Sequence, residues 1–186
     1  MIFRTALRRP ASLSFIALFA VIGMLALQSA AVAHDHVPPE TELLANGATL
    51  QQGELSSYCW IAAGATPGTG VGTCADGVFS FPSARVVAPG THVTLRILKA
   101  QKPRQLTISA WSKLNRHGVP VWKTGTDVRY KRHPVHLASG RAWDFTFVLA
   151  DNPRHYYLEV FGVWRDVDAG GGDQDASWMF HLRTSA

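Results

Sequence analysis

Hydrophobic and polar residues alternate with a period of two along most of the chain after residue 50. The alternation is clearest in residues 93–97, 106–110, 143–149 and 178–182. Because successive side chains of a β-strand point to opposite faces, each run predicts a strand with one buried face. Residues 156–164 are apolar on both faces except at Glu159, which predicts a central strand in a sheet covered by a second sheet.

Residues 55–61, 78–87 and 128–137 are further candidate strands, and glycine- or proline-containing turns separate the runs. No window after residue 34 sustains the 3.6-residue period of a helix. The pattern therefore predicts an all-β fold, an immunoglobulin-like β-sandwich of seven to nine antiparallel strands, with a closed barrel as the alternative. Pro134 lacks a backbone N–H, so we expect its strand at a sheet edge.

Residues 1–33 have the pattern of a signal peptide. Arg4, Arg8 and Arg9 precede an apolar run, and Ala31-Val32-Ala33 forms a small-x-small cleavage site. The apolar run, residues 14–27, is shorter than the roughly 20 residues of a membrane-spanning helix. The sequence therefore predicts Sec-type export with cleavage after Ala33, in preference to an uncleaved membrane anchor.

The expected secreted protein then has an extended N-terminal arm over residues 34–52 and one sandwich domain over residues 53–186, with no membrane segment. Cleavage removes three arginines and no acid, which lowers the net charge from +5 to +2. So small a charge disfavours a nucleic-acid-binding protein. Basic residues between Lys99 and Arg116 and in residues 129–133 form a candidate surface for anionic cell-wall or extracellular polymers, or a merely solvated face.

Cys59 and Cys74 are the only two cysteines. In an exported protein an even pair is most simply a disulfide, and the C-x-x-C spacing of a redox pair is absent. Serine-elbow, zinc-protease and nucleotide-binding motifs are also absent, so the sequence favours binding or structure over catalysis and requires no cofactor.

Two sequences contain candidate metal ligands. After cleavage, the amine of His34 and the imidazole of His36 would present the nitrogen set that Cu(II) prefers, or His34 would simply begin a disordered arm. The aspartates 166, 168, 173 and 175 surround a Gly-Gly-Gly run and would offer Ca²⁺ hard oxygen ligands, or form a polar hairpin turn. Asp166, Asp168, Asp173 and Asp175 do not have EF-hand spacing.

Tryptophans 143, 164 and 178 fall at core positions of the alternating runs. Trp60, Trp111 and Trp122 are less determined, and in an exposed, coplanar arrangement they would form a sugar-stacking platform. Packing in the core is the alternative for these three.

The stretches GELSSYCW…GTCAD, VVAPGTHVTLRI and YYLEVFGVWRD…GDQDASWMFHL are similar to a loose group of exported proteins and lipoproteins of Gram-positive bacteria. The resemblance covers most of residues 53–182 and implies a secreted sandwich domain without an assigned activity. We therefore expect a secreted, non-catalytic binding or structural β-sandwich. An extracellular copper protein and a calcium-dependent or carbohydrate-binding module are the alternatives.

Overall fold

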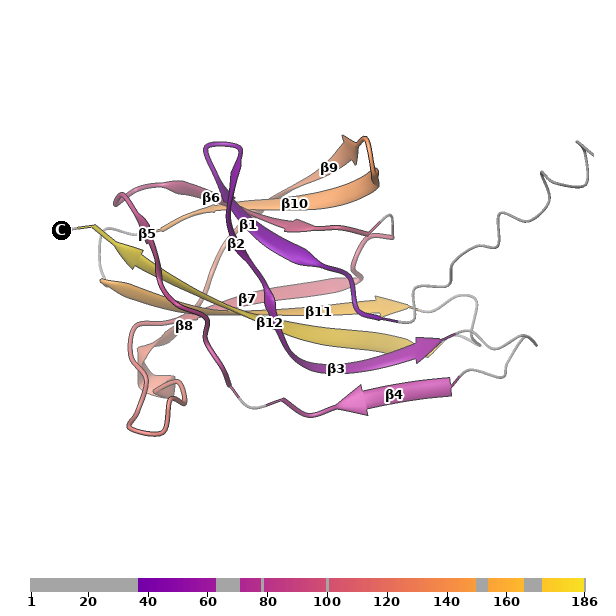
Figure 1. The fold of residues 1–186 in the computed structure, drawn as a ribbon, viewed down its shortest axis with the longest axis horizontal. Coiled ribbons are helices and arrows are strands. Elements are labelled where there is room, and N and C mark those ends of the chain that lie inside the picture. Colours follow the sequence, from indigo (N-terminus) through magenta and orange to yellow (C-terminus); the bar gives the residue numbers. More distant parts are fainter. Residues whose placement is uncertain are drawn as a thin grey trace, which may run out of the picture. The chain divides into compact units, whose positions relative to one another are not determined.

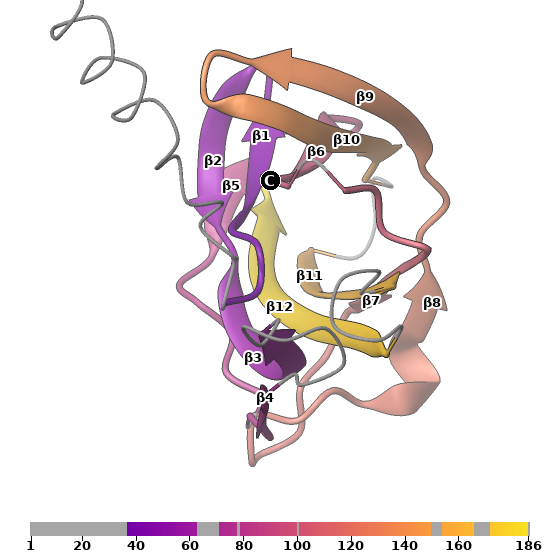
Figure 2. The same cartoon turned by 90° about the vertical axis from the view of Figure 1, so that its right-hand side faces the viewer.

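A computed structural model describes residues 37–62, 71–77, 79–99, 101–149, 154–165 and 172–185. Within these residues the chain is all-β, with two sheets packed face to face as a sandwich (Figures 1 and 2). None of the helices in the described residues is long and apolar enough to cross a membrane.

The five-stranded sheet has the order β2-β1-β6-β10-β9 and is antiparallel throughout. Its strands are β1 (Thr41–Ala45), β2 (Ala48–Gln52), β6 (His92–Ile97), β9 (Lys131–Leu137) and β10 (Gly140–Val148). The edge position of β9 confirms the expectation from Pro134.

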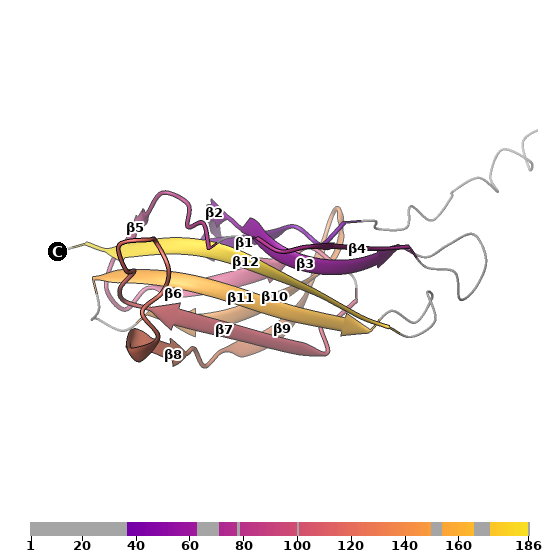
Figure 3. The ribbon, with the colours of Figure 1, turned by 90° about the horizontal axis from the view of Figure 1, so that it is seen from below.

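The seven-stranded sheet has the order β4-β3-β12-β11-β7-β8 (Figure 3). The seventh strand, β5, runs parallel to the end of β12. The strands are β3 (Glu54–Ala62), β4 (Val71–Ala75), β5 (Arg85–Val87), β7 (Gln105–Trp111), β8 (Gly125–Asp127), β11 (His155–Arg165) and β12 (Asp173–Thr184). A short 3-10 helix, η2 (Trp122–Thr124), precedes β8.

The core lies between the two sheets, where the alternating runs place their apolar side chains. Leu95, Ile97 and Phe145 of the five-stranded sheet are at most 1% exposed, as are Leu158 and Phe180 of the seven-stranded sheet. Full burial of such side chains stabilises a fold by about 1.5–3 kcal/mol each. The alternation therefore identified the inward faces of the long strands correctly.

The number of strands is larger than expected, because the short strands β1, β2, β4 and β8 have no sustained alternation of their own. Within the expected strand at residues 78–87, the described residues form a strand only at β5. Part of the expected arm, residues 41–52, is instead the hairpin β1–β2. Its two-residue turn uses Asn46 at φ 52° and Gly47 at φ 79°. Positive φ at both positions is what a type I′ hairpin turn requires, and Asn-Gly supplies it with little strain.

Candidate functional site

Cys59 and Cys74 form the predicted disulfide, and they stand directly opposite each other on β3 and β4. The bond thus joins the edge strand β4 to the body of the seven-stranded sheet. It leaves no free cysteine in the described residues.

The two candidate metal sites are described only in part. His34, His36, Asp166 and Asp168 lie outside the described residues, so the copper site stays a prediction. Asp173 and Asp175 belong to β12, and the Asp173 carboxylate lies 3.5 Å from the guanidinium of Arg104. In the ranges that the structure describes, no group of three or more His, Cys, Asp or Glu side chains could hold a metal ion.

The three undetermined tryptophans do not form one exposed platform. Trp60 is 1% exposed and packs edge-on against Trp164 at 5.5 Å, while Trp111 is 3% exposed. Trp122 is 72% exposed and its ring meets that of Trp111 edge-on at 5.8 Å. A sugar could therefore reach only Trp122 of the three, because packing buries the other two.

A cavity of about 630 Å³ lies beside the free edge of β10. Four of the residues that line it are buried, Ala110, Phe147, Leu149 and Tyr156, each at most 6% exposed. These side chains come from both sheets, so the cavity reaches the core between them. Its size is within the range of about 300–1,000 Å³ that is typical of small-molecule sites.

The cavity exists because β9 is shorter than its partner. Pairing between β9 and β10 runs from Gly140 opposite Leu137 to Thr146 opposite Lys131, whereas β10 continues to Val148. Just before β9 the chain passes from the seven-stranded to the five-stranded sheet. This crossing segment, residues 128–130, forms one wall of the cavity.

The crossing segment is fixed to the seven-stranded sheet at two points. The Val128 N–H donates to the Ile108 carbonyl over 2.8 Å, and the Tyr130 hydroxyl donates to the Leu106 carbonyl over 2.7 Å. A tyrosine hydroxyl is protonated at neutral pH, and burial raises the pKa of Tyr130 further above its ordinary value of 10.0, so the donor is retained. The wall is therefore formed before any ligand binds.

The mouth of the cavity carries more positive than negative groups. Arg129, Lys131, His92 and His133 are exposed there, and Asp127 is the one acid among the described lining residues. The Asp127 carboxylate accepts a hydrogen bond from the Ser109 hydroxyl at 3.2 Å. The mouth can thus bind an anionic group, while the buried walls can contact an apolar part of the same molecule.

A second cluster joins His155, Tyr157 and His181 on the seven-stranded sheet. The ring nitrogens of the two histidines lie 3.1 Å apart, and Tyr157 stacks on His181 at 4.3 Å. Burial, more than any other factor, lowers the pKa of His181, although a hydrogen bond to the Pro82 carbonyl opposes the shift. At neutral pH the cluster is therefore a packed, hydrogen-bonded surface that ties the Pro82 segment to the sheet.

Glu159, the one polar residue in the expected central strand, does lie on β11 between β12 and β7. Burial raises the pKa of its carboxyl group, and a 3.3 Å hydrogen bond from the Ser177 hydroxyl partly offsets that shift. No second acid or base is bonded to Glu159 among the contacts described. Because burial disfavours its charged form, the ionised carboxylate lowers the stability of the folded protein.

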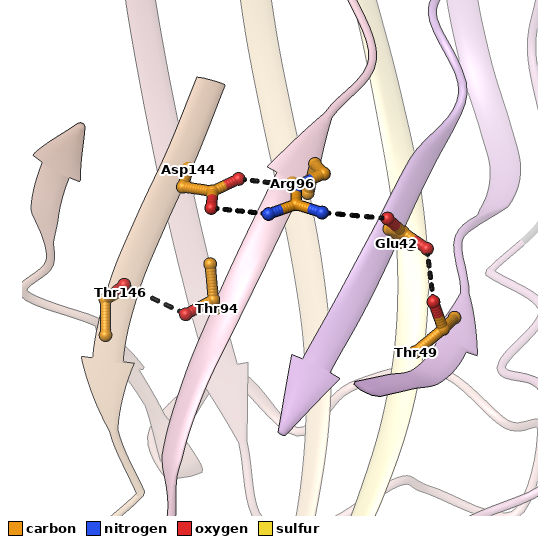
Figure 4. A network of polar contacts seen from close by, with 6 residues as sticks. All are labelled: Glu42, Thr49, Thr94, Arg96, Asp144 and Thr146. Carbon is orange, nitrogen blue, oxygen red and sulfur yellow. Dashed lines mark hydrogen bonds and ion pairs between the residues drawn. The ribbon is translucent and has the colours of Figure 1, made fainter. Parts of the chain in front are cut away.

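The outer face of the five-stranded sheet carries a polar network across four strands (Figure 4). Arg96 donates two 2.8 Å hydrogen bonds to Asp144 and lies 3.7 Å from the Glu42 carboxylate. Glu42 in turn accepts a 2.6 Å hydrogen bond from the Thr49 hydroxyl. These groups satisfy one another, so the network is structural.

The sequence did not indicate the cavity. Its interior residues read simply as core positions, and residues 128–137 read as one strand. The crossing at residues 128–130 appears only when both sheets are in place. The sequence predicts a basic surface at residues 129–133, but the position of these residues at a cavity mouth depends on the length of β9.

Comparisons with protein-family models, with curated proteins and with solved structures found no match to this chain.

Proposed function

We propose that this protein is a secreted, non-catalytic binding protein that holds a small molecule in the cavity beside β10. The observation that carries the proposal is the cavity of about 630 Å³ with buried apolar walls. Pockets of this size with apolar walls and a few polar groups at the mouth are the usual form of a small-molecule site.

The pinned crossing segment supports binding in a site that needs little rearrangement. Hydrogen bonds from Val128 and Tyr130 hold the wall to the seven-stranded sheet. A wall that is already ordered has less conformational entropy to lose when a ligand binds. Side chains from both sheets enclose the ligand, so its apolar part is removed from water.

Export is supported by the signal-peptide pattern of residues 1–33 and by the disulfide, since disulfides persist mainly in oxidising compartments. Mass spectrometry of the protein recovered from the culture medium of a secreting host tests this. A mature chain beginning at His34 is expected; protein retained in cells with its first 33 residues would overturn export.

We propose further that the sandwich is a variant of the immunoglobulin fold. The orders β6-β10-β9 and β12-β11-β7-β8 correspond to the two sheets of a variable-type domain. The parallel pairing of β5 with β12 fits the same scheme. Strands β1 to β4 then make up an N-terminal addition that widens both sheets.

A neutral fluorescent probe, N-phenyl-1-naphthylamine, tests the binding site. We expect its emission to rise when the protein is added and Val148→Trp to remove this rise, because Val148 lines the cavity and is 52% exposed. Val86→Trp is the matched control, since Val86 is 51% exposed on β5 and does not line the cavity. Equal binding by both variants, or no binding by the wild type, would refute the site.

A further inference from the structure

We infer that the ligand of the cavity is an amphipathic organic acid, with an apolar body inside and one anionic group at the mouth; this inference rests on the proposed function. Two features of the mouth, its charges and the direction of one backbone N–H, point to an anionic group. Each of these observations stands independently of the apolar walls.

The charges at the mouth favour an anion. The cationic side chains Arg129 and Lys131 lie two residues apart, one on the crossing segment and one at the start of β9. His92 and His133 supply two further ring N–H donors. Asp127, the one acid among the lining residues that the structure describes, already accepts a hydrogen bond from the Ser109 hydroxyl.

A backbone donor points to the same place. The Leu149 N–H donates to the Thr91 carbonyl, on the β6 side of β10. Since successive peptide groups of a strand point to opposite sides, the Val148 N–H points to the side of β9. Pairing with β9 stops at Thr146, so no β9 residue stands opposite Val148 in the described part of the chain.

Cationic side chains and a strand N–H that has no β9 residue opposite it are together the donors whose hydrogen bonds a carboxylate, sulfonate or phosphate accepts. The positive charges of Arg129 and Lys131 would repel a cationic ligand. A fully apolar molecule would offer these donors no acceptor. The arrangement therefore selects a ligand with one negative end.

Two probes with the same anilinonaphthalene skeleton test the inference. The 8-sulfonate derivative carries one negative charge and N-phenyl-1-naphthylamine carries none. We expect the sulfonate probe to bind about tenfold more tightly, the ratio that about 1.4 kcal/mol of charge-assisted hydrogen bonding provides. Its affinity should fall as sodium chloride rises from about 0.05 to 0.5 M, while the affinity of the neutral probe should not fall.

The double variant Arg129→Gln/Lys131→Gln should weaken the sulfonate probe about tenfold and change the neutral probe less than about twofold. Lys102→Gln/Arg141→Gln is the matched control, because it removes the same charge from two exposed residues that do not line the cavity. Decanoate should likewise displace the sulfonate probe at lower concentration than decanol.

The outcomes separate the two proposals. If the neutral probe binds and Val148→Trp removes it, but the sulfonate probe is no tighter or responds equally to both double variants, the acid is refuted and the binding site remains. If neither probe binds, the proposed function fails and this inference fails with it.

Discussion

Removing Arg96 should destabilise the protein more than removing either acid that it contacts. Arg96 stands between Asp144 on β10 and Glu42 on β1, and the three side chains are 18%, 13% and 12% exposed (Figure 4). In Arg96→Met both carboxylates lose their cation while staying mostly buried. Hydrogen bonding to Asp144 raises the pKa of Arg96 despite its partial burial, so the native sheet favours the charged form.

The expected losses follow from the geometry. Two hydrogen bonds of 2.8 Å join Arg96 to Asp144, whereas a single 3.7 Å ion pair joins it to Glu42. We expect Arg96→Met to lower the free energy of unfolding by about 3 kcal/mol and Asp144→Asn by about 2 kcal/mol. Glu42→Gln should cost only about 0.5–1 kcal/mol, because the longer contact is weak and Thr49 can still donate to the amide oxygen.

Urea unfolding followed by tryptophan fluorescence measures these differences, with the dependence of the free energy on urea required to stay constant. Double-mutant cycles then give the coupling of Arg96 to each acid. Equal losses for Asp144→Asn and Glu42→Gln would refute the reasoning, as would a loss below about 1 kcal/mol for Arg96→Met.

Three further predictions concern single features of the fold. Replacing Cys59 and Cys74 with serine should cost about 3 kcal/mol, because the disulfide spans 15 residues of the unfolded chain; an unchanged urea midpoint would contradict this. Glu159→Gln should stabilise the protein at pH 7 and not at pH ~3, because burial raises the pKa of Glu159 in the folded protein above the 4.5 of the unfolded chain. As the pH rises past 4.5, the unfolded state therefore loses this proton before the folded state does, and the folded state becomes less stable. Equal thermal shifts at both pH values would exclude this cause. Gly125→Ala should lower the free energy of unfolding by about 1–3 kcal/mol, since its Cβ would lie 2.5 Å from the Trp111 Nε1. A thermal midpoint equal to that of the wild type would contradict this, because it would mean that Gly125 and Trp111 separate at no cost.

The sequence came closest to the structure where a residue's role depends on its neighbours in the chain. Alternation over residues 143–149 and 178–182 found the buried faces of β10 and β12, because pleating alone decides which side chains share a face. Pro134 indicated an edge strand because it has no backbone N–H to donate to a second neighbouring strand. The Asn46-Gly47 pair also carried a hairpin signal, and the expectation of an extended arm overlooked it.

Local sequence patterns did not predict which functional candidates are exposed or which side chains meet across strands. Trp60 and Trp111 are buried and Trp122 is exposed, although all three are tryptophans in strand or turn surroundings. Their exposure depends on which segments cover them, and those segments are distant in sequence. The ionic network around Arg96 likewise joins residues that are 48 positions apart, Arg96 and Asp144, through strand register alone.

By itself, then, the amino-acid sequence determined the β class, the inward faces of the long strands and the pairing of the two cysteines, because each follows from local periodicity or from there being a single pair to join. Only the tertiary structure decided the two-sheet order, the edge of β10 left open where β9 begins, and the cavity between the sheets. These depend on the relative lengths and register of strands far apart in the chain, which no local pattern encodes.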